Sequence, residues 1–141
     1  MQRIEFHYET DFSLEQEPSY KIWLDNVVRS ENYTVGSISY IFCDDDYLYN
    51  LHKGFLNNDS FTDIITFDYV QGTEVSGDIF ISIERVKENA VKFDCSFNEE
   101  LSRVMAHGLL HLMGYKDKSE EDIKMMRRKE DEKIRLFHVE H

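Results

Sequence analysis

The sequence contains few of the residues that interrupt or cross-link a fold. It has one proline, Pro18, six glycines and two cysteines among 141 residues. No Pro- or Gly-rich stretch offers a linker and no repeat divides the chain, so we expect a single metal-dependent hydrolase domain over residues 1–141. Cys43 and Cys95 share no CxxC spacing, and each lies among apolar residues. This pattern indicates two buried free thiols without a chemical role.

Long hydrophobic runs are also missing. No apolar stretch approaches the roughly 20 residues that a helix needs to cross a bilayer. The first ten residues, MQRIEFHYET, carry charges where a secretory signal would be apolar. We therefore expect a cytoplasmic protein that does not use a membrane.

Basic residues are scarce. The chain has 16 lysines and arginines against 28 acidic residues, which gives a formal net charge of −12. Neutralisation of phosphates by basic side chains supplies much of the affinity of non-specific nucleic-acid binders. Composition alone therefore argues against tight nucleic-acid binding, and cleavage of RNA would require a basic cleft or a metal ion.

The chain contains alternating strand and helix patterns. Period-2 apolar residues predict a short first strand, and two segments rich in β-branched and aromatic residues predict a hairpin. Ser96 and Ser119, each followed three residues later by an acid, mark the starts of the last two helices. The expected strands are residues 3–8, 37–42, 64–70 and 78–83, and the expected helices are residues 19–30, 44–55, 84–93, 96–114 and the segment after 119.

This order of elements predicts an α+β fold, in which a small mixed sheet is covered by helices. The helix expected over residues 84–93 carries Val86, Ala90, Val91 and Phe93 on a helical pattern. The last helix contains the charge run EEDIKMMRRKEDEK. We interpret that run as a solvated face whose apolar strip consists only of Ile123, Met126 and Ile134.

The segment AHGLLHLMGYKDK (106–118) is the most informative for chemistry. His107 and His111 are four residues apart, so they lie on one face of a helix, about 6 Å apart along its axis. Gly114 can turn the chain back, and Asp117 follows three residues later. Two helical imidazoles, one carboxylate and an open position match a catalytic zinc site rather than a structural one. We expect one zinc ion per chain at His107, His111 and Asp117.

The same residues have a plainer interpretation. Two histidines at this spacing in an apolar helix could be satisfied core or interface side chains. Asp117 lies in KDKSEED and could be one solvated acid in a charged loop. The combined spacing of the histidines, Gly114 and Asp117 favours the metal site.

The motif resembles the YbeY endoribonucleases, also described as ribosomal RNA maturation factors. Their hallmark is a helix bearing HGxLHLxGYDH, which stands here as HGLLHLMGYKD (107–117). Two upstream blocks are similar to family strands: TDIITF (62–67) to a TDVLSF-type strand, and GDIFIS (77–82) to a GDIxIS strand. The glutamate-rich helix after the motif is similar too, so the likeness runs from about residue 51 to residue 132.

The resemblance implies an α+β domain with a mixed sheet, a divalent metal ion that is usually zinc, and hydrolysis of single-stranded RNA. It implies a role in trimming and quality control of ribosomal RNA, with that RNA and ribosomal subunit proteins as partners. When the family's motif is aligned with this sequence, the resemblance implies that His107 and His111 are the first two metal ligands. No general base is implied.

Two positions depart from the family pattern. The third ligand is usually histidine, where this sequence has Asp117, an acceptable zinc ligand that adds a negative charge. The family often has a basic residue, commonly arginine, shortly before the TDxxxF strand, and the aligned position here is Leu56. Lys53, one helical turn earlier, is the candidate substrate-binding residue, although a solvated surface lysine is the favoured interpretation. Without it, the charge that develops on phosphorus must be neutralised by the metal ion or the ribosome.

Three further interpretations remain open. Asp63 and Asp78 could orient a metal-ligating histidine or cap turns at strand starts, and the caps are slightly favoured. A zinc peptidase would have H-E-x-x-H with glutamate as general base, but Gly108 occupies that position and cannot accept a proton. A zinc-stabilised ribosome-assembly factor that binds without cutting is the non-enzymatic alternative, favoured by the acidic composition and by Leu56.

Overall fold

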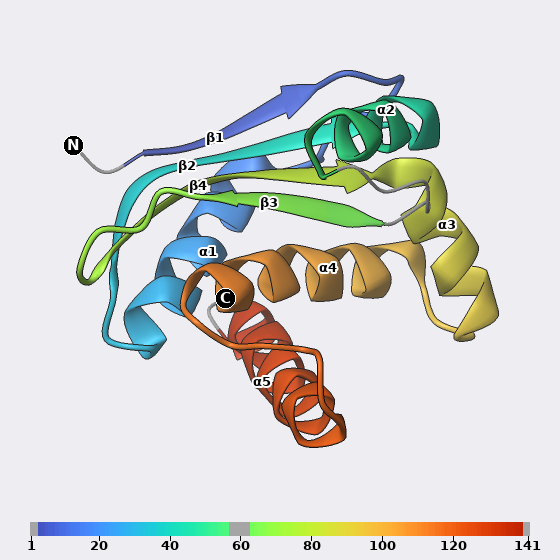
Figure 1. Cartoon of the computed structure of the whole chain (residues 1–141). Helices are drawn as coiled ribbons and strands as arrows, with labels where there is room; N and C mark the ends of the chain where they lie inside the picture. The colour runs from blue at the N-terminus through green and yellow to red at the C-terminus, as the bar shows by residue number, and fades with distance from the viewer. Residues whose placement is uncertain (1–2, 57–62, 140–141) are drawn as a thin grey trace.

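A four-stranded sheet forms the frame of the molecule (Figure 1). The computed structural model describes residues 3–56 and 63–139, with side chains for residues 3–51 and 63–137. The strand order is β1-β2-β4-β3; the first two pairs are parallel, and β3 runs antiparallel to β4. In chain order the elements are β1 (Arg3–Tyr8), α1 (Glu17–Ser30), β2 (Thr34–Cys43), α2 (Asp45–Leu56), β3 (Ile64–Asp68), β4 (Glu74–Ser82), α3 (Ile83–Lys92), α4 (Phe97–Leu112) and α5 (Glu120–Val139). The expected α+β fold with a mixed sheet is confirmed.

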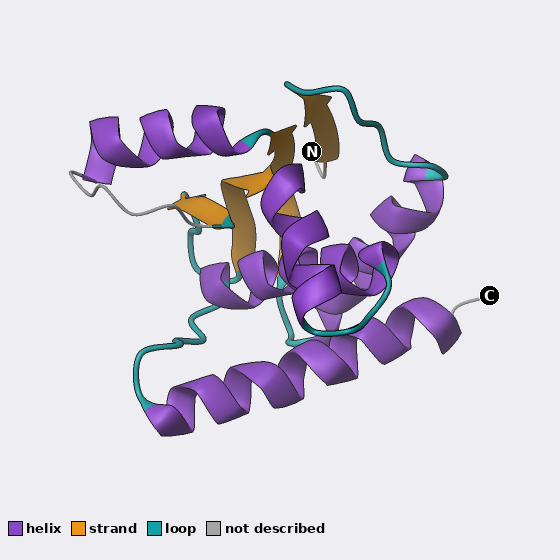
Figure 2. Ribbon diagram, turned by 90° about the vertical axis from the view of Figure 1, so that its right-hand side faces the viewer, coloured by secondary structure: helices purple, strands orange, loops and turns teal. Residues whose placement is uncertain are grey.

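One face of the sheet carries the main core, because alternate residues of each strand point to the same side. Ile38, Tyr40 and Phe42 of β2 lie on this face together with Ile79 and Ile81 of β4, and all five are buried. Helices α1 and α4 cover this face, and α5 packs against the outer side of α4 (Figure 1). Figure 2 shows α5 running along the side of the molecule opposite the strands.

The opposite face of the sheet is covered only in part. Cys43, Leu48 and Ile65 form a second, smaller cluster of buried residues under α2. Cys43 is a buried free thiol, as expected, whereas Cys95 is free but only half-buried. In the described part of the chain, no helix is long and apolar enough to span a membrane.

Helix α4 begins and ends where the sequence predicts. The Ser96 hydroxyl accepts a hydrogen bond from the backbone N–H of Glu99 at 3.0 Å, and the Glu99 carboxylate accepts one from the backbone N–H of Ser96 at 3.4 Å. This capping box satisfies two donors at the start of the helix. After the helix, Gly114 has φ = 100°, a left-handed conformation that favours glycine and turns the chain towards Asp117.

Helix α5 differs from the expected solvated face. Glu130 is 6% exposed and Lys133 is fully buried, whereas Ile123, assigned to the apolar strip, is 52% exposed. Lys133 donates hydrogen bonds to Ser30 and to the carboxylates of Glu31 and Glu132. The prediction of a solvated charge run was therefore wrong for the residues that face α1 and α4, because these charges are paired inside the fold.

The apolar residues of the α3 region are divided between core and surface, and one expectation about β4 needs correction. Helix α3 buries Val86 and Ala90, whereas Val91 is 83% and Phe93 53% exposed. Asp78 does not cap a strand start, because β4 begins at Glu74 and Asp78 pairs with Phe67 within the hairpin. The hairpin itself is confirmed, with a shorter turn than expected.

Candidate active-site pocket on helix α4

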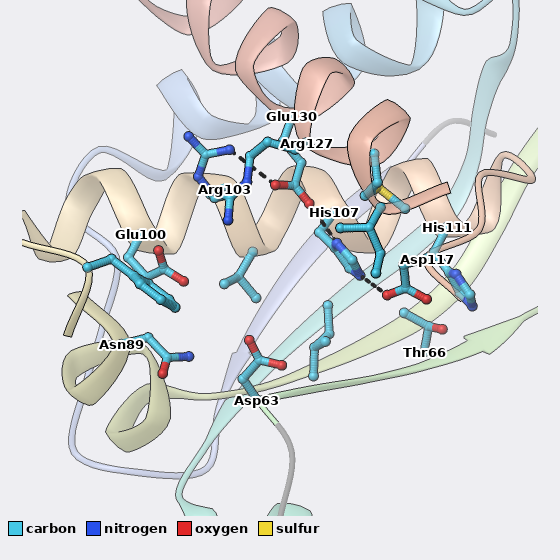
Figure 3. Close-up of a pocket in the computed structure, with 15 residues that line it drawn as sticks. Asp63, Thr66, Asn89, Glu100, Arg103, His107, His111, Asp117, Arg127 and Glu130 are labelled. Atoms are coloured by element: carbon cyan, nitrogen blue, oxygen red, sulfur yellow. Dashed lines mark hydrogen bonds and ion pairs between the residues drawn. The ribbon is translucent and has the colours of Figure 1, made fainter. Parts of the chain in front are cut away.

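A pocket of about 600 Å³ opens between α4, α5, the end of α3 and β3. His107 and His111 project into it from α4, and Asp117 enters from the loop after Gly114. Figure 3 shows His107 near the middle, with His111, Asp117 and Thr66 at one end and Asn89 and Glu100 at the other. The structure therefore brings all three predicted metal ligands to one pocket.

Glu130 fixes the imidazole of His107. The Nδ1 atom of His107 lies 2.7 Å from Oε2 of Glu130, in a partly buried contact between α4 and α5. When the ring is neutral with its proton on Nδ1, it donates that proton to Glu130 and offers the Nε2 lone pair to the pocket. Histidines that bind metals commonly donate their other ring N–H to a carboxylate in this way.

Asp117 faces the free nitrogen of the same ring. Its Oδ2 atom is 3.3 Å from Nε2 of His107. Two ligands about 2.0–2.1 Å from a tetrahedral zinc ion lie roughly 3.3–3.4 Å from each other, so the spacing of this pair suits one metal ion between them.

His111 is the third candidate ligand, because an imidazole can bind zinc. It lies on the same face of α4 as His107 and lines the same pocket. Its side chain is exposed, and no hydrogen bond or ion pair joins it to His107 or Asp117. Within residues 3–51 and 63–137, no three histidine, cysteine or acidic side chains are gathered closely enough to hold a metal ion as they stand. The two imidazoles and the carboxylate fit zinc chemically, and the pair of His107 and Asp117 fits it in spacing.

Arg103 lies in α4, one helical turn before His107, and its side chain supports Glu130 of α5. Its guanidinium donates to Oε1 of Glu130 at 3.1 Å and to Oδ1 of Asp131 at 2.7 Å. A chain of contacts therefore runs from Arg103 through Glu130 to His107. Because Glu130 is almost fully buried, this chain fixes the position of the imidazole.

The charges in the pocket shift the protonation of its groups. Burial lowers the pKa of His107, but the hydrogen bond and charge of Glu130, together with the charge of Asp117, outweigh it and leave that pKa raised. Burial raises the pKa of Asp63 and the pKa of Glu100. With neutral histidines, the lining has four carboxylates against the two guanidinium groups of Arg103 and Arg127, so it is formally negative and favours a cation.

Gly108 points away from the pocket and onto the sheet. A Cβ atom at this position would lie 2.9 Å from Cγ2 of Ile79 and 3.1 Å from Cδ1 of Ile64. The position at which a zinc peptidase has its glutamate is therefore filled by strands β3 and β4. A longer side chain there would disrupt the helix–sheet contact before it could act as a base.

The other sequence predictions concern residues around the pocket. Lys53 belongs to α2, and its side chain, like that of Leu56, is outside the described residues. Asp63 lines the pocket just before β3, but the carboxylate bonded to His107 is that of Glu130. Sequence reasoning missed Glu130, Arg103 and Arg127. Glu130 was detectable, since it falls four residues after Met126, on the apolar strip of α5.

The fold and this pocket define a class of small α+β proteins in which a two-histidine helix packs on a mixed sheet. A family model described as endoribonuclease YbeY matches residues 4–138. A protein named endoribonuclease YbeY from Flavobacterium johnsoniae is 58% identical, over 97% of this chain and 99% of its own length. One with the same name from Bacteroides thetaiotaomicron is 40% identical, over 81% of this chain and 83% of its own.

A solution structure of a Thermotoga maritima protein superposes with a TM-score of 0.71 and 29% identity. The match covers 96% of this chain and 89% of that one. The chain belongs to the endoribonuclease YbeY family, which confirms the resemblance seen in the motif. It is accordingly a member of a family of hydrolases that cut RNA.

Proposed function

We propose that this protein is a zinc-dependent endoribonuclease that cuts single-stranded RNA in the cytoplasm during maturation and quality control of ribosomal RNA. The family relationship supports the cleavage of RNA. The observation that carries the metal site is His107, held through Nδ1 by Glu130 with Nε2 3.3 Å from Asp117.

His107, His111 and Asp117 would hold the zinc ion, one per chain. When bound, zinc lowers the pKa of a water molecule and stabilises negative charge on a phosphate. Glu130 keeps His107 in the tautomer whose Nε2 lone pair faces the pocket, and Arg103 keeps Glu130 in place. These two residues act by positioning the ligand rather than by touching RNA.

Arg127 is the pocket residue best suited to meet a phosphate. It lines the pocket from α5, and Arg103 is already bonded to Glu130 and Asp131. A guanidinium matches the geometry of phosphate oxygens. Arg127 can therefore take the part that the family often gives to an arginine near the Leu56 position, with Lys53 as a second candidate.

The acidic surface suggests how the enzyme meets its substrate. A net charge of −12 disfavours tight binding to free RNA. We infer that ribosomal subunit proteins help to place the enzyme on ribosomal RNA, and that cleavage of naked RNA is weak and falls as salt rises.

Cleavage of a single-stranded ribosomal RNA fragment tests this proposal. The parent protein should cut internally, stop when the metal is chelated and recover when zinc is returned, while a peptide substrate remains intact. A His111→Ala protein purified in parallel controls for contaminating nuclease, because His111 is exposed and its loss should not disturb the fold. Equal cleavage by the two proteins would remove the support for an enzyme and favour the non-cutting assembly factor.

A further inference from the structure

The pocket continues past the His107–Asp117 pair towards helix α3. Its far end is lined by Asn89 and Phe93 from the α3 region and by Glu100 from α4. Glu100 lies seven residues before His107, which is about 10 Å along the helix axis. Figure 3 shows Asn89 and Glu100 at this end, on the other side of His107 from His111. The distance leaves room for a nucleotide beside the proposed cleavage centre.

An exposed aromatic side chain lies at this end of the pocket. Phe93, directly after α3, is 53% exposed and lines the cavity. Single exposed apolar residues are ordinary on a protein surface, but this one opens into the cavity that holds the proposed cleavage centre. An exposed aromatic ring in an RNA-processing pocket is a suitable surface for stacking a base.

Two carboxylates and one amide line this end, beside the cations of Arg103 and of Lys92, whose Nζ lies 5.7 Å from the centroid of the Phe93 ring. Glu100 and Asp63 bring carboxylates, and the Asn89 amide can both donate and accept. Carboxylates accept hydrogen bonds from the amino group of cytosine, and asparagine pairs with the amino group and N7 of adenine. Uracil has a carbonyl oxygen in place of that amino group, so it would face a carboxylate with another acceptor.

We propose that Asn89, Phe93 and Glu100 form a base subsite, which binds one unstacked nucleobase of the RNA next to the cleaved bond and prefers a base with an exocyclic amino group over uracil. The base stacks on the Phe93 ring, and Glu100 and Asn89 contact its edge. This inference rests on the proposed function for its substrate class. It adds a subsite and a base preference that the metal ligands do not determine.

Binding measured without cleavage tests the subsite. Short 2′-O-methyl oligonucleotides of adenine, cytosine or uracil, with a fluorescent label, are titrated with protein in the presence of a chelator, and anisotropy gives Kd. The parent should bind the adenine and cytosine oligomers more tightly than the uracil oligomer. Phe93→Ala should weaken adenine and cytosine binding by about fivefold or more, the range expected for loss of one stacked base.

Tyr69→Ala is the matched control. Tyr69 is 56% exposed, follows β3 at the end opposite Asp63, and does not line the pocket. Its removal should leave Kd unchanged. Glu100→Gln should narrow the preference for adenine and cytosine over uracil, because the amide that replaces the carboxylate can donate to a uracil oxygen.

Phe93→Trp gives a spectroscopic signature of base binding. It also tests the subsite if the alanine variant fails to fold. Its tryptophan fluorescence should be quenched when the adenine oligomer binds, against a constant signal from Trp23, which is 1% exposed. Unchanged Kd in Phe93→Ala, or no quenching in Phe93→Trp, would overturn the subsite even if the protein cuts RNA. Base-selective binding by a protein that never cuts would instead overturn the proposed function and leave the subsite standing.

Discussion

Glu130 sets the orientation of His107, the first proposed metal ligand. The spacing of the motif places the imidazole on the pocket side of α4, but spacing does not determine which ring nitrogen faces outward. The contact of 2.7 Å between Nδ1 and Glu130 determines it, since it assigns Nε2 to the pocket. Glu130 comes from another helix, 23 residues further along the chain, so the orientation of the ligand depends on tertiary packing.

Glu130→Gln should weaken zinc binding by about tenfold or more. The amide keeps the volume of the side chain but loses the charge that polarises His107, and loss of such a partner costs 10–100-fold in metal affinity. Competition with a chromophoric chelator measures the affinity, and thermal unfolding of the zinc-free proteins checks that the fold survives. A zinc affinity equal to that of the parent would show that Glu130 has only a structural role.

Asp117 is the proposed ligand that departs from the family pattern, and two substitutions test it. Asp117→His should retain zinc, because a neutral nitrogen of similar reach replaces the carboxylate oxygen, whereas Asp117→Ala removes the donor and should weaken binding substantially. The same chelator competition measures both. If the Asp117→Ala protein binds zinc as tightly as the parent, Asp117 is a loop acid that lies near His107 without holding a metal.

The helices show which parts of the fold can be predicted from local sequence. The capping box of α4, its end near Gly114 and the hairpin of β3 and β4 depend on residues a few positions apart, and all three are present. The burial of α5 could not be predicted in the same way. Its charged residues look solvated until α1 and α4 supply their partners, Glu31 and Arg103.

Gly108→Ala should destabilise the contact between α4 and the sheet. A Cβ atom would lie 2.9 Å from Ile79, and overpacking of this kind costs about 1–3 kcal/mol. Alanine also gains about 1 kcal/mol in helix propensity over glycine, so a net loss of about 1 kcal/mol is expected. Urea unfolding measures the change. A variant more stable than the parent would show that the sheet yields to the extra methyl group.

The ion cluster between α1 and α5 predicts a pH-dependent stability. Burial alone would raise the pKa of Glu31, but hydrogen bonds from Lys133, Tyr115 and Lys129 outweigh it and lower that pKa from 4.5 to about 2. A carboxyl with a lowered folded-state pKa stabilises the fold above its ordinary pKa and loses that contribution as pH falls towards the folded value. Glu31→Gln should therefore reduce the free energy of unfolding by about 1.5–3 kcal/mol at pH 7.

The difference between Glu31→Gln and the parent should shrink as pH falls from about 4.5 towards 2, which urea unfolding at several pH values measures. Glu132→Gln is the matched control, because Glu132 also contacts Lys133 but its side chain is 46% exposed, against 12% for Glu31. Its effect should be smaller at every pH. A Glu31→Gln deficit that stays constant down to pH 3 would contradict this account.

For the whole molecule, the net charge of −12 and the family's activity on RNA are reconciled at the pocket. The chain as a whole is acidic, and the pocket lining is formally negative, so under the proposed function the positive charge needed at the cleaved bond would come from a bound cation together with Arg127. The motif was sufficient to propose the three candidate ligands, which the structure places in one pocket, because they lie within eleven residues. It could not predict Glu130, Arg127 or the base subsite, which the fold brings in from α3 and α5.

Zinc titration of the chelator-treated protein is the most direct test of the central claim that one site binds zinc and cuts RNA. Bound zinc and the rate of single-stranded RNA cleavage are measured on the same samples of the parent and of His111→Ala. In the parent, the rate should rise with bound zinc and level off at one ion per chain, while His111→Ala should show neither tight binding nor cleavage. Full cleavage by the zinc-free parent, or equal zinc binding and cleavage in His111→Ala, would contradict the account.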